Sequence, residues 1–268
     1  MQTLIYEGLK IISDKLVSIH DTLVVEAPLQ ININNEAYTV VMRTPDNDKE
    51  LIRGLLFAED IYKKSNPFDI EIKKEQNKIP SIINLNIAKE TLGKGYLNKR
   101  TLLSVSSCGI CGKQKLEDVK VKGKKLDFKG SVPTKKLFKM YAKMNSLQET
   151  FKVSGGSHAA AIFDKNQNLL SIKEDIGRHN AVDKSVGELL LKNSLKQANY
   201  LLVSGRVSYE IVSKAFIAKI PIIVAVSACS SLAVDFAKEF GICLIGFTRE
   251  NKMTIYSNPS FIKNLENV

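Results

Sequence analysis

Residues 198–255 read ANYLLVSGRVSYEIVSKAFIAKIPIIVAVSACSSLAVDFAKEFGICLIGFTRENKMTI. The apolar runs at 200–203, 222–226 and 242–245 have the length of buried strands, and apolar residues at helical spacing follow the first two. Ser230 or Ser231 can cap the second helix and Gly241 can end it. This alternation predicts an α/β fold whose parallel strands are joined by crossover helices.

Polar residues follow each of these predicted strands. They occupy 204–206, 227–231 and 247–252. In open α/β sheets, ligands bind beyond the carboxyl ends of the strands, where helix N-termini offer free N–H groups to anions. The sequence therefore predicts one anion-binding edge that contains all three segments.

The rest of the chain predicts two further parts. Residues 159–164 and 169–172 form a predicted β-hairpin before a helix that begins near residues 175–180, so residues 137–268 form a predicted α/β domain. Upstream, short β-type runs at 22–26, 31–33 and 37–42 are divided by Pro28 and by Asn34-Asn35, and a helix is predicted at 48–57. We expect a small mixed β-rich domain over residues 1–106 and a mobile loop with a charged linker over 107–136.

Composition narrows the possible partners. The chain has 268 residues, is 44% hydrophobic and carries a formal net charge of +11, which favours an anionic partner. Nucleic acid is not expected, because the lysines are dispersed, aromatic residues make up 7% and no recognition motif is present. Without a long apolar run or a signal-like start, we expect a soluble cytoplasmic protein with no membrane segment.

Two of the four cysteines, Cys108 and Cys111, lie in the glycine-flanked segment SSCGICG at 106–112. Gly109 and Gly112 disfavour regular structure there, so the segment is predicted to be an accessible loop. The other two cysteines, Cys229 and Cys243, have apolar or small neighbours and are expected to be ordinary buried thiols.

This thiol pair has three ordinary uses. A zinc site would need two more ligands, but there is no second CxxC, and His158 and His179 are 21 residues apart in different predicted elements. A thioredoxin-like couple would need a helix directly after the pair, which the charged downstream sequence does not predict. A persulfide-carrying nucleophile needs an accessible thiolate, a second thiol and mobility, and Lys113 and Lys115 favour the thiolate. A plain exposed turn is the fourth alternative.

A second polar cluster surrounds the predicted hairpin. It contains His158, Asp175, Arg178, His179, Asp183 and Lys184. His179 and Asp183 are four residues apart on one predicted helix, so the carboxylate could fix the imidazole tautomer. The cluster is either part of a ligand site or a buried polar network that holds the helix to the sheet.

Seven segments of the chain resemble, in order and spacing, the formate dehydrogenase accessory sulfurtransferases of the FdhD/NarQ family. They are EAPL (26–29), MRTP (42–45), SCGICG (107–112), GGSHAA (155–160), EDIGRHNAVDK (174–184), SGR (204–206) and SLAV (231–234). The resemblance extends over about residues 20–258. It implies a C-terminal domain with a three-layer, cytidine deaminase-like fold that lacks the deaminase zinc ligands, so no bound metal is expected.

The resemblance also implies a function. A cysteine desulfurase would donate sulfur as a persulfide on Cys108, with Cys111 as its partner thiol. The sulfur would pass to the molybdenum cofactor, bis(molybdopterin guanine dinucleotide), of the formate dehydrogenase catalytic subunit. The implied acceptor site lies at 247–252, where a GDP-like moiety would bind, and the implied assembly is a homodimer. The expected cofactor-binding residues are Phe247, Thr248, Arg249, Glu250, Asn251, Lys252, Arg206, His158, Arg178 and His179. The alternative is a chaperone that delivers the cofactor without transferring sulfur.

Overall fold

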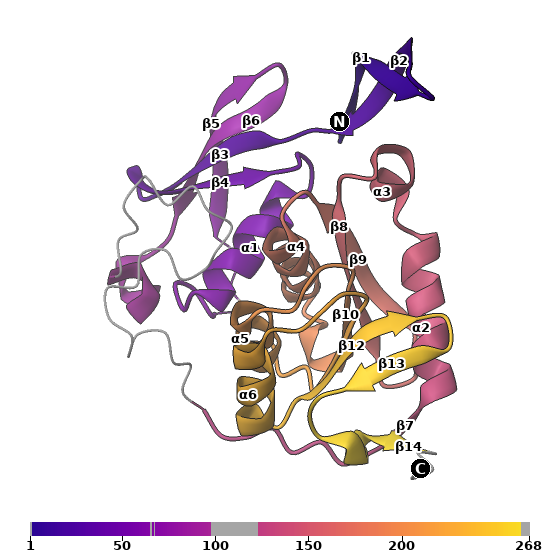
Figure 1. Ribbon diagram of the computed structural model, residues 1–268. Helices are drawn as coiled ribbons and strands as arrows, with labels where there is room; N and C mark the ends of the chain where they lie inside the picture. Colours follow the sequence, from indigo (N-terminus) through magenta and orange to yellow (C-terminus); the bar gives the residue numbers. More distant parts are fainter. Residues whose placement is uncertain (1, 65, 67, 98–122, 264–268) are drawn as a thin grey trace.

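The computed structural model describes residues 2–64, 66, 68–97 and 123–263, and its largest sheet has six strands (Figure 1). The strand order is β13-β12-β11-β10-β8-β9. These strands are β8 (His158–Asp164), β9 (Leu169–Asp175), β10 (Ala198–Val203), β11 (Ile222–Ala225), β12 (Cys243–Arg249) and β13 (Lys252–Ile255). β10, β11 and β12 are parallel as predicted, but β8 and β13 pair antiparallel to them, so the sheet is mixed.

Helices cover both faces of this sheet (Figure 1). On one face α4 (Arg178–Leu191), α5 (Tyr209–Ile217) and α6 (Ser231–Phe240) bury their apolar sides against alternate strand residues. On the other face α2 (Thr134–Ser146) packs through Leu137, Met140 and Met144, beside the short pair β7 (Val132–Pro133) and β14 (Ile262–Lys263). The predicted caps of α6 are confirmed, because Ser230 accepts a hydrogen bond from the Ala233 amide and Gly241 is left-handed.

The N-terminal part has a four-stranded sheet of order β4-β3-β6-β5. Its strands are β3 (Ala27–Ile33), β4 (Glu36–Arg43), β5 (Asp69–Gln76) and β6 (Ile79–Asn86), and α1 (Asp48–Ala58) shares their apolar core. Pro28 lies inside β3 and does not divide two strands as predicted. A separate hairpin, β1 (Thr3–Ile12) and β2 (Lys15–Val24), projects from the body.

Short elements complete the chain. These are α3 (Glu149–Ser154) and the 3₁₀ turns η1 (Lys89–Thr91), η2 (Lys94–Leu97), η4 (Leu195–Gln197) and η5 (Pro259–Phe261). Within the described ranges, no helix combines the length and the apolar character needed to cross a bilayer.

The predicted charged linker differs from expectation in its last part. Residues 107–122 lie outside the described residues. Beyond them, the Leu126 amide donates to the Phe240 carbonyl, and the Phe128 and Phe261 rings lie 4.9 Å apart. α2 then begins at Thr134, because Leu137 and Met140 find a buried apolar surface. The predicted boundary at residue 137 thus falls inside α2, and the division into domains stays a prediction.

α1 and α4 cross at backbone contact and join the N-terminal part to the six-stranded sheet. A Cβ atom on Gly54 would lie 1.9 Å from the Asp183 carbonyl oxygen, and one on Gly187 would lie 1.8 Å from the Glu50 carbonyl oxygen. Only glycine permits this approach. The crossing fixes the position of the α4 N-terminus.

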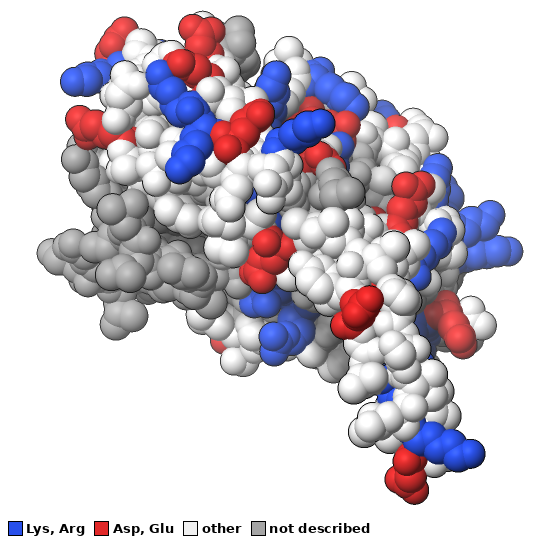
Figure 2. All heavy atoms as spheres, turned by 90° about the horizontal axis from the view of Figure 1, so that it is seen from above, with Lys and Arg blue, Asp and Glu red and all other residues white. Residues whose placement is uncertain are grey.

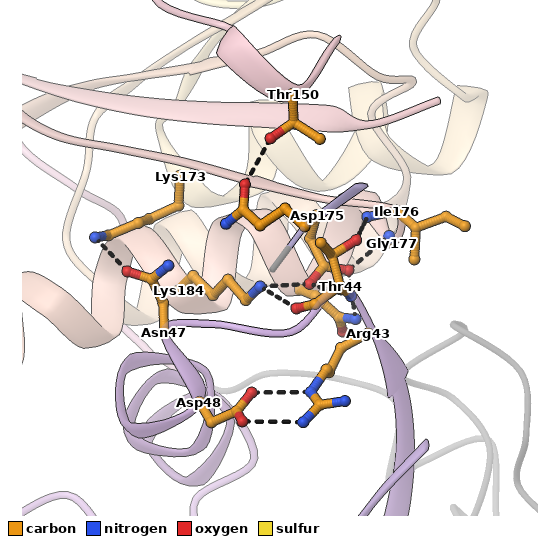
Figure 3. Close-up of polar contacts among 12 residues, drawn as sticks. Arg43, Thr44, Asn47, Asp48, Thr150, Lys173, Asp175, Ile176, Gly177 and Lys184 are labelled. Atoms are coloured by element: carbon orange, nitrogen blue, oxygen red, sulfur yellow. Dashed lines mark hydrogen bonds and ion pairs between the residues drawn. The ribbon is translucent and has the colours of Figure 1, made fainter. Parts of the chain in front are cut away.

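A buried polar network reinforces this junction (Figure 3). The Lys184 ammonium lies 2.7 Å from the Asp175 carboxylate, with both side chains fully buried, and it also donates to the Thr44 carbonyl. Asp175 accepts hydrogen bonds from the backbone of Thr44 and Gly177 and from the Asn180 side chain. Polar groups of motif residues from both parts of the chain therefore pair with one another in the interior.

Candidate functional site

Loops that are far apart in sequence meet at one edge of the six-stranded sheet. β9, β10 and β11 end there, β8 begins there, and α4, α5 and α6 each begin directly beyond it. Val207, directly after the first predicted polar segment, exchanges backbone hydrogen bonds with Ala228 and Ser230 of the second, and Phe247 of the third donates one to Ser227 of the second. The structure therefore brings the predicted segments together. Three strand spacings of about 4.8 Å separate β8 from β12, which gives the edge room for an elongated ligand.

Arg178 and Arg206 make one end of this edge cationic, and His158 lies beside them. Gly205 lies against two of them: a Cβ atom there would be 3.2 Å from both Arg178 Cβ and His158 Nδ1. Burial lowers the pKa of the half-buried His158 imidazole, and the nearby charges of Arg178, Arg206 and His179 lower it further. His158 is therefore neutral at pH 7, and the local positive potential favours an anion.

His179 is held by two residues that the sequence did not suggest. Its Nε2 atom lies 2.8 Å from the Glu210 carboxylate and 3.2 Å from the Ser208 hydroxyl. An ionised Glu210 requires a proton on Nε2, so in the neutral ring Nδ1 is an acceptor and in the charged ring it is a donor. The only sequence signal was that both partners lie at the start of the helix after the 204–206 turn.

The predicted pairing of His179 with Asp183 is wrong. The Asp183 carboxylate lies 2.6 Å from the Lys214 ammonium of α5, although burial raises the pKa of this carboxyl. A tertiary partner of opposite charge outcompetes the local i,i+4 neighbour. The residues of the 174–184 motif therefore have two roles. Asp175, Asp183 and Lys184 stabilise the interior. Arg178 and His179 lie at the edge.

The segment 247–252 was predicted to follow a strand, but it forms the hairpin of β12 and β13. Arg249 pairs in register with Lys252 across the exposed turn residues Glu250 and Asn251. The exposed Phe247 has a left-handed backbone with φ of 50°. Two cations therefore lie on neighbouring strands of a hairpin that also carries an exposed aromatic ring, a set of groups that suits a base with an attached phosphate.

Three buried polar atoms of the predicted site residues have no hydrogen-bond partner among the described residues. They are Nε of Arg178, Nδ1 of His179 and Oγ1 of Thr248. Buried polar groups are rarely left unsatisfied, so such atoms suggest a missing ligand. Together with the arginines and the helix N-termini, they fit a ligand with several anionic oxygens.

The cysteines divide into two groups. Cys108 and Cys111 lie outside the described residues. Cys229 and Cys243 are free, and burial raises their pKa values to about 11 and about 12, so both are poor nucleophiles at neutral pH. In the described ranges, no three side chains of His, Cys, Asp or Glu are grouped as metal ligands.

Anion binding at this edge should strengthen as the pH falls. A bound anion favours the imidazolium, so binding raises the lowered pKa of His158 and takes up a proton. Calorimetry with inorganic pyrophosphate should show several-fold tighter binding at about pH 6 than at about pH 8. The change in affinity is corrected for the protonation of pyrophosphate itself. His158→Gln should remove the pH dependence that is left after this correction. His20→Gln, on the distant β2, should retain it. An equal pH response in all three proteins would contradict this role.

Comparison with known proteins gives consistent matches. The model of the FdhD/NarQ family matches residues 24–263. A sulfur carrier protein FdhD from Picrophilus torridus is 41% identical over 250 residues, covering 91% of this chain and 93% of its own. Another from Saccharolobus solfataricus is 40% identical, covering 90% and 91%.

A solved structure is similar over nearly the whole chain. It is the crystal structure of a protein from Desulfotalea psychrophila assigned as a formate dehydrogenase accessory protein. The TM-score is 0.76, with 20% identity, 98% of this chain covered and 100% of the other. At that identity the likeness shows a shared fold.

Proposed function

Because this chain belongs to the FdhD/NarQ family, we propose that it is a sulfur carrier and sulfurtransferase that supports formate dehydrogenase. Its relatives are named sulfur carrier proteins, and the matches cover nine tenths of the chain. The observation that carries the proposal is the assembly of cationic side chains and unpartnered buried atoms at one sheet edge. This edge provides a place for an anionic sulfur acceptor.

In the proposed reaction, Cys108 carries the sulfur. Its thiolate attacks the outer sulfur of a persulfide on a cysteine desulfurase, the donor's S–S bond breaks and the donor thiolate leaves. Cys111 then attacks the inner sulfur of the Cys108 persulfide. This step forms a Cys108–Cys111 disulfide and releases sulfide to the acceptor, so the two thiols are oxidised as the sulfane sulfur is reduced. A thiol reductant restores the pair.

The proposed acceptor is the substrate bis(molybdopterin guanine dinucleotide), destined for the formate dehydrogenase catalytic subunit. Phe247 can stack on a guanine, while Arg249 and Lys252 can bind the adjoining phosphates, as for GDP. Arg178 and Arg206 can bind further phosphate oxygens at the other end of the edge. Successive loops would thus bind the anionic parts of one long ligand.

Further parts of the proposal concern setting and assembly. We place the reaction in the cytoplasm, where thiols stay reduced, and the free Cys229 and Cys243 support this. We propose that the six-stranded sheet, with helices on both faces, is the cytidine deaminase-like domain. Two copies of the chain are proposed to associate.

Arg249→Ala should weaken GDP binding by about 10- to 100-fold, because a charge-assisted hydrogen bond contributes roughly 1.5–3 kcal/mol. Calorimetry with GDP measures this directly. Lys165→Ala is the matched control, since Lys165 is exposed in the turn between β8 and β9, at the opposite end of the sheet. An unchanged GDP affinity in Arg249→Ala would show that the β12–β13 hairpin is not part of the acceptor site.

A further inference from the structure

The N-terminus of α4 combines an uncapped helix end with two buried nitrogen atoms that need a partner. Its N-cap residue is Gly177, which has no side chain to accept from the first-turn amides, and the first turn holds no acidic residue. Nε of Arg178 and Nδ1 of His179, the first two residues of the helix, have no hydrogen-bond partner in the described part of the chain. Amides, guanidinium and imidazole at one place suit an oxyanion.

Glu210 determines which nitrogen of the His179 ring can serve such a ligand. The ring is buried, with 6% of the side chain exposed, and its Nε2 atom lies 2.8 Å from the Glu210 carboxylate. Glu210 lies in the first turn of α5, where the positive helix end favours the ionised carboxylate. An ionised carboxylate can only accept, so Nε2 keeps its proton. Any change in the protonation of the ring therefore occurs at Nδ1.

Ser208 does not make this group a nucleophilic triad. In a Ser–His–acid triad the serine and the carboxylate contact opposite ring nitrogens. Here the Ser208 hydroxyl lies 3.2 Å from Nε2, the same atom that contacts Glu210. This geometry favours a binding role for the ring over activation of a serine.

We propose that the N-terminus of α4 binds one phosphate group of the anionic acceptor and that Glu210 is the positioning residue of this subsite. Glu210 keeps one proton on Nε2 and supplies the negative charge that lets the ring take a second proton from solvent. Nδ1 of His179 then donates to a phosphate oxygen, beside Nε of Arg178 and the first-turn amides. The ring gains one proton when the anion binds and returns it when the anion leaves. This inference rests on the acceptor edge proposed above and not on sulfur transfer.

Other carboxylates near His179 have cationic partners of their own. Asp183, one turn further along α4, lies 2.6 Å from the Lys214 ammonium of α5. Asp175, at the end of β9, lies 2.7 Å from the Lys184 ammonium. Glu59, which follows α1, also interacts with Asp183. The carboxylate of α5 that contacts Nε2 is therefore the one that can compensate a charged ring.

The neighbouring arginines make protonation of the ring depend on the anion. The charges of Arg178 and Arg206 act on the His158 imidazole, and so does that of His179. In the free protein these cations disfavour a second proton on the His179 ring, and a bound anion offsets them. Anion binding and protonation at Nδ1 should therefore occur together.

Surface lysines are the alternative place for a small anion to bind. On the face that Figure 2 shows, lysine and arginine side chains are interspersed with acidic ones. An anion held only at such a surface would leave the buried His179 ring unchanged. The protonation of Nδ1 therefore distinguishes the subsite from weak surface binding.

Nitrogen-15 NMR of the histidine rings tests the inference on the unaltered chain. The chain has only three histidines, and His179→Gln identifies the signals of His179. At about pH 7.5 the free protein should carry the His179 proton on Nε2 alone. Addition of inorganic pyrophosphate should protonate Nδ1 as well.

Glu210→Gln tests the positioning role. Because the compensating charge is lost, pyrophosphate should bind about tenfold more weakly in calorimetry, and Nδ1 should no longer gain a proton on binding. Glu188→Gln is the matched control, since Glu188 lies near the other end of α4 and its side chain is 17% exposed. The control should match the unaltered chain in both measurements.

The outcomes separate this subsite from the rest of the acceptor edge. A neutral ring protonated on Nδ1, or an Nδ1 that stays unprotonated with pyrophosphate bound, would overturn the inference even if Glu210→Gln does not fold. An unchanged Nδ1 response in a folded Glu210→Gln would overturn it too, whatever the affinity. In these cases Arg249→Ala still tests the hairpin end of the edge. If the unaltered chain does not bind pyrophosphate, both the subsite and the proposed acceptor edge are wrong.

Discussion

Cys108→Ala should abolish activation of formate dehydrogenase by this protein. Removing the thiol removes the nucleophile, and the described cysteines cannot replace it because burial raises the pKa of Cys229 to about 11 and that of Cys243 to about 12. We expect a loss of more than about 100-fold, as is usual when a covalent nucleophile is deleted. The measurement is formate oxidation by a dehydrogenase matured in cells that contain only the variant.

Two further variants separate sulfur transfer from cofactor delivery. Cys111→Ala should load sulfur and then slow its onward transfer, whereas Cys229→Ala should behave like the unaltered chain. GDP binding should be unchanged in Cys108→Ala and Cys111→Ala, because neither residue belongs to the proposed acceptor edge. Full activation by a Cys108/Cys111 double alanine variant would contradict sulfur transfer and favour a delivery chaperone.

Lys184→Met should lower the free energy of unfolding by about 3–5 kcal/mol, because it leaves a buried carboxylate uncompensated. Lys184 and Asp175 are both fully buried, and methionine also cannot donate to the Thr44 carbonyl. Denaturant unfolding followed by circular dichroism measures the loss.

The control for this prediction lies directly after the same helix. Lys192 pairs with Glu188 in α4, but its side chain is 60% exposed. Lys192→Met should therefore change stability by less than about 1 kcal/mol, as for other surface ion pairs. Similar small effects of both substitutions would contradict the structural role assigned to Lys184.

Local signals made the sheet around β10, β11 and β12 predictable. Short apolar strands, a serine cap at Ser230 and a terminating Gly241 all agree with the observed elements. The anion-binding edge followed from this topology, because strand ends and helix starts coincide in such a sheet. The arrangement of the three loops could therefore be predicted without knowing a single side-chain contact.

Features that depend on tertiary contacts could not be predicted in this way. From the sequence, Asp183 was predicted to pair with its helical neighbour His179. In the structure Asp183 pairs with Lys214 and His179 pairs with Glu210, and both partners lie on another helix. The sequence pattern did not predict α2, because the helix contains several lysines and only three of its positions are buried. The β1–β2 hairpin has apolar residues on both faces, so it lacks the alternation that identifies a half-buried strand.

The most direct test of sulfur transfer follows one labelled sulfur atom. The protein is incubated with a cysteine desulfurase and ³⁵S-cysteine, and the peptide containing residues 106–112 is then isolated without reductant. Mass spectrometry should find one added sulfur atom on Cys108, and the label should pass to bis(molybdopterin guanine dinucleotide) when that cofactor is added. Label that never enters this peptide, or that reaches the cofactor equally well with Cys108→Ala, would contradict a persulfide carried by Cys108.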